Sequence, residues 1–148
     1  MRQDRTETVI VAGWERWTLR LAGVYNVVWG AWVVLAPAGF LSMLGVEGLT
    51  EQGLAIWQCV GMIVGVYGIG YWVAASDPHR HWPIILVGML GKLFGPIGFA
   101  DAVLVKEIFP LTFGWTIVTN DLVWWVPFCL ILWRSWKSGR ARRKGGDA

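Results

Sequence analysis

Four long runs of apolar residues, separated by short polar stretches, dominate the pattern along the chain. They cover about 17–36, 53–75, 83–105 and 111–133. At a rise of about 1.5 Å per residue, each run is long enough to cross the roughly 30 Å hydrocarbon core of a bilayer as an α-helix. We therefore predict an all-α membrane protein, with four transmembrane helices in a bundle that forms a single domain over residues 1–148.

The connections between the runs carry helix-ending signals. The first run ends at Pro37, the second ends before Pro78, and the third begins at Pro83, where a first-turn proline is well tolerated. Residues 37–52 contain apolar side chains but are too short to span. This stretch predicts either an interfacial helix or a packed loop between spans 1 and 2.

A signal-peptide interpretation competes for the first run, because the tripeptide APA at 36–38 resembles a cleavage site with small residues. The run before it carries Tyr25, Asn26, Trp29 and Trp32, which do not suit the apolar region of a signal peptide. We expect the first run to be a retained span.

Composition excludes an ordinary soluble domain. The chain is 55% hydrophobic and 16% charged, with a mean hydropathy of +0.50, whereas soluble domains carry about 25% charged residues. It also has 19 glycines and 12 tryptophans. Glycine is frequent in membrane helices and tryptophan is enriched at their interfaces.

The basic residues are distributed unevenly about the four runs, and this distribution predicts the orientation. One side of the membrane holds both chain ends and the 76–82 loop. Its basic residues are Arg2, Arg5, Arg16, Arg20, Arg80, Arg134, Lys137, Arg140, Arg142, Arg143 and Lys144. The other side has only Lys106. By the positive-inside rule both termini are expected in the cytoplasm, which predicts a multi-pass inner-membrane protein.

Residues 134–148 form a basic tail directly after the fourth run. Because this tail follows a hydrophobic segment, orientation explains it better than nucleic-acid binding does, and attraction to anionic lipid is a secondary effect. The expected partners are the lipid bilayer and other membrane subunits or further copies of the chain, with no nucleic acid.

Two opposite charges, Lys92 and Asp121, interrupt the third and fourth runs near their centres. A charge at a helix centre costs roughly 2.5–3.5 kcal/mol on insertion scales, so it is rarely kept without a partner or a role. Counting helical rise from the ends of the runs places both at the bilayer midplane, about 14–15 Å deep. Asn26 reaches the same level, and Asn120 adjoins Asp121.

Further polar residues extend this predicted cluster. Thr116 and Thr119 lie along the fourth run, Tyr25 adjoins Asn26, and Gln58 lies about 8 Å below the outer boundary. We expect Lys92, Asp121 and Asn26 to point inward.

A proline lies close to each of the two charges, and pairs of glycines occur in the second and third runs. Pro96 cannot donate a hydrogen bond to the carbonyl of Lys92, and Pro127 likewise frees the carbonyl of Val123, so both helices are expected to kink there. The pairs Gly91/Gly95 and Gly61/Gly65 have the four-residue spacing that lets neighbouring helices approach closely, so we expect close helix packing at these positions.

Two interpretations of the Lys92–Asp121 pair remain open. In the first, the pair is a structural ion pair that sets the register of the helices. In the second, it is a proton relay or a site for a polar headgroup or a quinone, since ionisable groups inside a membrane are functional candidates by default.

The sequence gives little support for a disulfide bridge, a metal site or a known catalytic motif. Cys59 and Cys129 are predicted at different depths, so we expect no bridge and two buried thiols. His79 and His81 lie in a short loop with Asp77, too few ligands for a metal site, and we expect the loop at the lipid headgroups. The motifs of nucleotide-binding loops, serine hydrolases and zinc proteases do not occur. We expect no cofactor and no metal, and an enzymatic role is unsupported.

Four segments carry a family resemblance. They are LAGVYN at 21–26, WQCVGM at 57–62, GKLFGP at 91–96 and TND at 119–121. With these segments the chain resembles a family of small bacterial four-helix membrane proteins, and more distantly it is similar to DoxX-like proteins. The resemblance implies the span count but no mechanism. Some relatives carry the label alkyl hydroperoxide reductase, yet this chain lacks the PxxxTxxC signature of that peroxidase class.

These patterns favour an accessory or scaffold subunit of a membrane complex, in which Lys92, Asp121 and Asn26 hold the helices together. The alternative is a small binding or transport protein for a proton-linked or lipophilic ligand, such as a quinone or a lipid. A water-accessible cavity that reaches Lys92 or Asp121 would favour the alternative.

Overall fold

The structure is a computed structural model that describes the backbone of residues 11–146 and the side chains of residues 11–140. All regular elements in this part of the chain are helices. Four of them are long and apolar enough to cross a membrane, over Gly13–Leu35, Glu51–Ala74, Trp82–Val105 and Leu111–Arg140. The prediction of an all-α, multi-pass membrane protein is confirmed at this level. The basic residues before Val11 and after Arg140, which are part of the predicted orientation, lie outside the residues whose side chains the structure describes.

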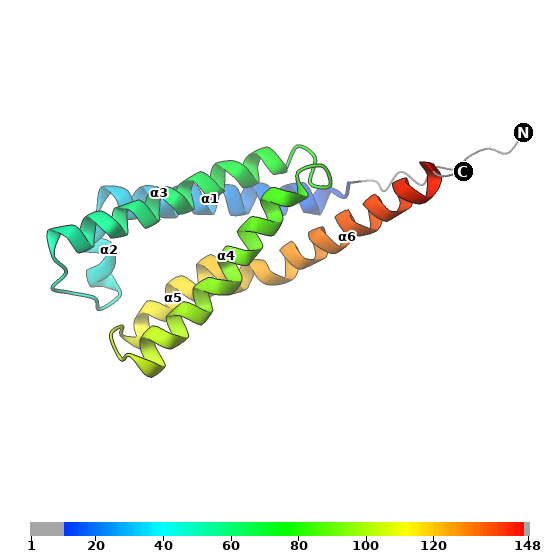
Figure 1. Cartoon of the computed structure of the whole chain (residues 1–148). Helices are drawn as coiled ribbons and strands as arrows, with labels where there is room; N and C mark the ends of the chain where they lie inside the picture. The colour runs from blue at the N-terminus through cyan, green and yellow to red at the C-terminus, as the bar shows by residue number, and fades with distance from the viewer. Residues whose placement is uncertain (1–10, 147–148) are drawn as a thin grey trace, which may run out of the picture.

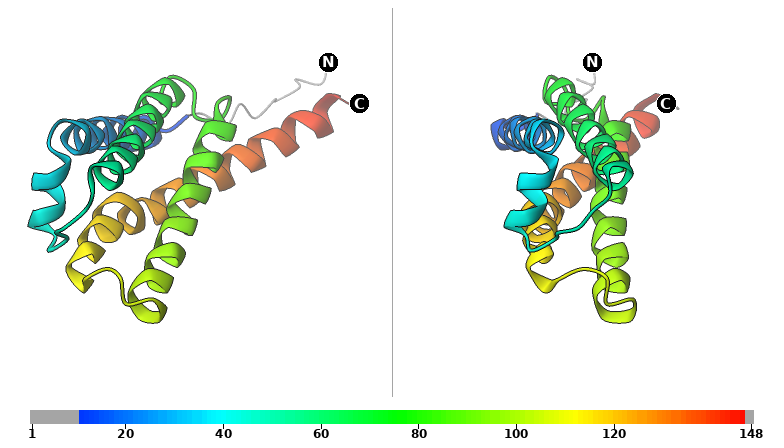
Figure 2. Two further views of the ribbon diagram at one scale, coloured as in Figure 1. Left: turned by 60° about the vertical axis from the view of Figure 1, so that its left-hand side comes forward. Right: turned by 90° about the vertical axis from the view of Figure 1, so that its left-hand side faces the viewer.

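The long helices form two antiparallel pairs. Helix α1 (Gly13–Leu35) packs along α3 (Glu51–Ala74), and α4 (Trp82–Ala100) packs against α6 (Val123–Gly146). Figure 1 shows the two pairs diverging from the end that holds the α3–α4 loop, and Figure 2 shows the same spread from two other directions. We call this the His79 end, after the loop residue buried there, and the opposite one the α2 end.

Glycine explains why α1 and α3 make the most extensive contact of the fold. Gly23 faces Gly68 and Gly30 faces Gly61, so both helices carry glycines seven residues apart. A Cβ on Gly68 would lie 2.6 Å from the carbonyl oxygen of Gly23, and one on Gly23 would lie 2.8 Å from that of Gly68. The two backbones therefore touch, as small residues allow in membrane helices. Of the predicted pair, Gly61 faces α1 directly. A Cβ on Gly65 would meet nothing within 4 Å, but the Gly65 backbone nitrogen lies 2.9 Å from where a Cβ on Gly30 would stand, so Gly65 also belongs to the close approach.

A short helix joins the two pairs at the α2 end. Helix α2 (Pro37–Met43) occupies the first part of the predicted 37–52 stretch, a loop of mostly exposed residues follows it, and α3 begins at Glu51. Its Phe40 packs edge-on against Trp29 of α1, with ring centroids 5.3 Å apart. Across the gap, the Thr112 hydroxyl donates to the carbonyl of Leu44 over 2.5 Å. The α2 segment thus connects α1 with the start of the fourth span.

The third and fourth spans depart from regular α-helix. The third ends in a π-helical turn, η1 (Asp101–Val105), and the fourth begins as a 3₁₀ turn, η2 (Leu111–Phe113). One α-helical turn, α5 (Gly114–Ile117), leads into a second π-helical turn, η3 (Val118–Leu122). Helix α6 then continues past the predicted boundary at Trp133 to Gly146, so the start of the basic tail is helical.

The outer surface of the helices is largely apolar. Large side chains such as Leu35, Val66, Leu104 and Val126 are exposed. Cys59 and Cys129 are free, as predicted, but both are exposed. The expectation of buried thiols was wrong, because α3 and α6 pack through their other faces.

Candidate functional site

Lys92 and Asp121 both point into the protein, as the sequence predicts. Lys92 lies on α4 and is 4% exposed, and Asp121 lies on η3 and is 6% exposed. With Asn120 they form what we call the central cluster. Their depth along the two helices matches, since η3 packs against α4.

The two charges do not form a direct ion pair. Within residues 11–140, no Lys92 nitrogen and Asp121 oxygen come within 4.0 Å of each other. The Lys92 ammonium instead donates to the backbone carbonyl of Asn120. It also lies 5.8 Å from the ring centroid of Tyr71 on α3, within cation–π range. The Asp121 carboxylate accepts from the Asn120 amide over 3.3 Å.

The π-helical turn η3 explains why a carbonyl is available to Lys92. In this turn the Val123 N–H donates to the carbonyl of Val118, five residues back. A π turn inserts an extra residue into the helix, which disturbs the regular four-residue pairing and is frequent at functional sites. The carbonyls of Thr119 and Asn120 accept from side chains: Trp124 Nε1 donates to the first over 3.1 Å, and Lys92 donates to the second.

The backbone carbonyl of Lys92 also accepts a hydrogen bond from a side chain. Pro96 has no N–H to donate to the carbonyl of Lys92, as noted from the sequence. Trp125 Nε1 donates to that carbonyl over 3.0 Å. The indole therefore replaces the missing helix hydrogen bond and adds a contact between α4 and α6.

Two glycines of α4 make room for the cluster. A Cβ on Gly95 would lie 2.9 Å from Asp121 Oδ2, so only a glycine lets the carboxylate approach so closely. Gly88 similarly accommodates the Tyr71 phenol, whose atoms would collide with a Cβ there. Gly91, the other glycine predicted for close packing, faces open space.

Asn26 is buried but does not complete the cluster. It is 2% exposed, and no hydrogen bond joins it to Lys92 or Asp121 among the described residues. Its Oδ1 atom is buried without a partner, as is Oδ1 of Asn120. Gln58 lies elsewhere, where its amide donates to the carbonyl of Val34 over 2.8 Å.

The remaining predicted polar residues line a groove between α1, α2 and the fourth span. Thr116 and Thr119 each donate to a backbone carbonyl of their own helix, over 2.7 and 2.8 Å. The Tyr25 ring packs against Trp124, with centroids 5.9 Å apart. These three line a groove of about 680 Å³ together with aromatic side chains that include Trp29, Trp32, Phe40, Trp115 and Trp124.

A second buried cluster lies at the His79 end. Glu15 on α1 is fully buried, and its Oε1 atom accepts from Arg134 Nε on α6 over 2.7 Å. His79, from the α3–α4 loop, places Nε2 3.3 Å from the same oxygen. Ser138 Oγ lies 3.3 Å from His79 Nδ1 and donates to the carbonyl of Arg134. We call Glu15, His79, Arg134 and Ser138 the His79 cluster.

The His79 cluster was not predicted from the sequence. We expected the loop to lie at the lipid headgroups, whereas the His79 side chain is buried in the protein and 7% exposed. Helix phase was the available signal: Glu15 precedes Leu19, Ala22 and Asn26 at alternating spacings of four and three, and all four are buried. A charge in phase with a buried stripe indicates a buried charge.

The two loop histidines have different partners. His81 Nδ1 lies 3.0 Å from the Asp77 carbonyl, while His79 points toward Glu15. Among the described residues, no three His, Cys, Asp or Glu side chains gather as a metal site.

Comparison with known protein families, with curated proteins and with solved structures finds no match. The resemblance to small four-helix bacterial membrane proteins therefore stays a prediction. The geometry itself indicates two internal polar clusters. The central cluster joins α4 to η3 of the fourth span, and the His79 cluster joins α1 to the α3–α4 loop and α6.

Proposed function

We propose that this chain is an accessory or scaffold subunit of a complex in the bacterial inner membrane. What supports the proposal most is the way the central cluster is buried. Lys92 and Asp121 are 4% and 6% exposed, and Lys92 is bonded to a carbonyl of the neighbouring span. A buried charge that is held by a neighbouring helix suits a part in fixing the register of the helices.

The proposed orientation places both termini in the cytoplasm. The four apolar helices need a bilayer to cover their exposed side chains. The basic residues favour the His79 end as the cytoplasmic one. A reporter fused after residue 148 that is active only in the cytoplasm should be active, and a periplasm-dependent reporter at the same place should be silent. The opposite pair of results would reverse the orientation.

The exposed cysteines give a direct test of the scaffold role. Cys59 lies on α3 and Cys129 on α6, and both are exposed on the helix surfaces. A photoreactive amino acid that replaces Cys59 or Cys129 should, on irradiation of native membranes, form an adduct of fixed mass with a subunit of another kind. The unsubstituted chain, irradiated in the same way, should form no such adduct.

Mild-detergent extraction followed by size separation and mass spectrometry completes this test. The same partner should migrate with the chain in constant ratio. A chain that migrates alone, and whose photoadducts contain only lipid or a second copy of itself, would refute the scaffold role.

A second function, the binding of a lipophilic ligand such as a quinone or a lipid, is favoured by the aromatic groove. The groove of about 680 Å³ is within the usual size of small-molecule pockets. Aromatic rings stack on flat ligands, and the threonine hydroxyls supply polar contacts.

Filling the groove would separate this function from the first. Val24 lines the groove and is exposed, so Val24→Phe should reduce the amount of any quinone or lipid that co-purifies. Val66→Phe is the matched control, since Val66 is an exposed valine of α3 that does not line the groove. Equal ligand content in the two variants would exclude the groove as the binding site.

A further inference from the structure

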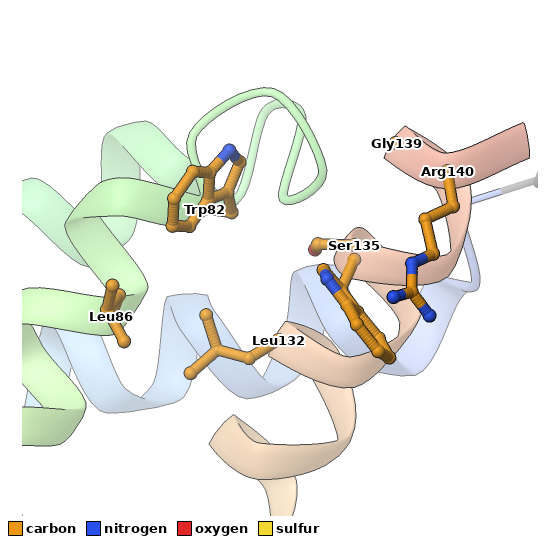
Figure 3. Close-up of a pocket in the computed structure, with 7 residues that line it drawn as sticks. Trp82, Leu86, Leu132, Ser135, Gly139 and Arg140 are labelled. Atoms are coloured by element: carbon orange, nitrogen blue, oxygen red, sulfur yellow. The ribbon is translucent and has the colours of Figure 1, made fainter. Parts of the chain in front are cut away.

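A cavity at the His79 end lies between the start of α4 and the extension of α6. It has a volume of about 500 Å³. Figure 3 shows Trp82 and Leu86 of α4 on one side and Leu132, Ser135, Gly139 and Arg140 of α6 on the other. Trp136 also lines it. Neither the central cluster nor the His79 cluster contributes a residue to this lining.

The cavity is apolar at one end and cationic at the other. Leu86 and Leu132 lie deeper along the spans, and Arg140 lies at the end nearest the C-terminus (Figure 3). The Arg140 guanidinium carbon lies 3.8 Å from the ring centroid of Trp136. Within residues 11–140, no carboxylate forms a salt bridge with Arg140. Stacking on the indole holds the guanidinium in place and leaves its edge N–H groups free to donate.

The level of the cavity along the spans matches a membrane interface. Trp82 is the first residue of the third candidate span, and tryptophan favours the interface. Two further cations at this end also lie over indoles: Arg20 over Trp17 at 5.4 Å and Lys137 over Trp133 at 3.7 Å. Of these three cations, Arg140 alone lines the cavity.

We infer that this cavity binds an anionic phospholipid, with its phosphate on Arg140 and the start of an acyl chain between Leu86 and Leu132. A guanidinium pairs with a phosphate through two parallel N–H···O bonds. A small hydrophilic anion would leave the apolar end of the cavity unfilled, whereas a lipid fills both the apolar end and the cationic end. Basic pockets between membrane helices on the cytoplasmic side suit anionic headgroups. The inference requires a membrane location but not the scaffold role.

The test titrates the purified full-length chain in a neutral detergent and measures bound ligand by native mass spectrometry. The ligands are phosphatidylglycerol, phosphatidylcholine and inorganic phosphate. We expect one phosphatidylglycerol per chain to bind at least fivefold more tightly than phosphatidylcholine, with no phosphate bound at the same concentrations. Equal binding of the two lipids, or binding of phosphate alone, would overturn the inference.

Two matched charge variants locate the site. Arg140→Gln and Lys137→Gln remove the same charge from the same helix, but only Arg140 lines the cavity. Arg140→Gln should weaken phosphatidylglycerol binding about fivefold, the effect of roughly 1 kcal/mol per basic residue near a membrane surface. Lys137→Gln should weaken it less than twofold. Equal losses would show a diffuse basic surface and refute a site.

A second pair of variants tests the volume without changing charge. A Cβ on Gly139 would meet nothing within 4 Å, so Gly139→Phe should fold and fill the cavity. Gly91→Phe is the control, since Gly91 also faces open space but lies outside the cavity. Gly139→Phe should abolish phosphatidylglycerol binding while Gly91→Phe retains it, both at unchanged helix content. Retention in Gly139→Phe would refute the inference.

Discussion

The central cluster and the His79 cluster both bury a carboxylate, but they satisfy it differently. Glu15 has an arginine at 2.7 Å, a histidine at 3.3 Å and the Ala12 N–H at 2.8 Å. Asp121 accepts one hydrogen bond, from the Asn120 amide at 3.3 Å. The nearby cation, Lys92, donates to the backbone carbonyl of Asn120 and not to the carboxylate. A buried charge that keeps a direct ionic partner loses much when the partner is removed. The difference therefore predicts strong pair coupling at the His79 end and weak coupling at the centre.

Removal of Arg134 should have the largest effect. Arg134→Met leaves a fully buried Glu15 carboxylate without its cation, and we expect a loss of about 3 kcal/mol in the free energy of unfolding. The measurement is reversible unfolding by a denaturing detergent in mild detergent micelles. Adding Glu15→Leu should restore most of the loss. Arg140→Met is the control on the same helix and should change stability by less than about 0.5 kcal/mol.

Lys92→Met should cost about 2 kcal/mol, because it leaves the Asn120 carbonyl and the Asp121 carboxylate buried without the cation. Lys92→Met with Asp121→Leu should be more stable than the single variant, yet with a coupling energy of only about 1 kcal/mol, since no direct ion pair joins the two. The same unfolding assay measures both. Coupling as large as that of Glu15 with Arg134 would contradict the distinction between the clusters.

Two glycines of α4 provide the next test. Gly95→Ala places a Cβ 2.9 Å from Asp121 Oδ2 and should cost about 1–2 kcal/mol by displacing the carboxylate. Gly91→Ala meets nothing within 4 Å and should be neutral or stabilising by up to about 1 kcal/mol, the gain in helix propensity. Equal effects of the two substitutions would mean that the carboxylate does not approach α4 as described.

The smallest effect concerns the indole that bonds to the Lys92 carbonyl. Trp125→Phe keeps the ring and removes the hydrogen bond at 3.0 Å, for a loss of about 1 kcal/mol. In a Pro96→Ala background the new N–H can satisfy that carbonyl, so the same substitution should cost less than about 0.5 kcal/mol. Thermal unfolding of the four proteins completes the cycle, and identical costs in both backgrounds would refute the compensation.

The sequence predicted the central cluster better than the His79 cluster for a physical reason. Lys92 and Asp121 are isolated charges inside apolar runs, so their burial follows from position alone. Glu15 and Arg134 lie at span ends among other charges, where exposure is the usual outcome. Their contact joins residues 119 positions apart, and only the packed helices bring them together.

Backbone hydrogen bonding accounts for the features of the central cluster that the sequence did not predict. The freed carbonyl of Lys92 follows from Pro96 and was predicted, although its indole partner was not. The π turn at Val118–Leu122 has no proline or glycine to mark it, so the release of the Asn120 carbonyl could not be read from the sequence. Asn26 was predicted to point inward and it is buried, but burial alone does not determine which neighbour it faces.

The bond between Glu15 and Arg134 also has a consequence for biosynthesis. The two residues are 119 positions apart, so at about 5–20 residues per second the ribosome makes Arg134 roughly 6–24 s after Glu15. The first helical pair is therefore synthesised before the Arg134 partner of its carboxylate. Only α6 supplies the Arg134 guanidinium, and a nascent chain truncated before residue 134 leaves the acid without it.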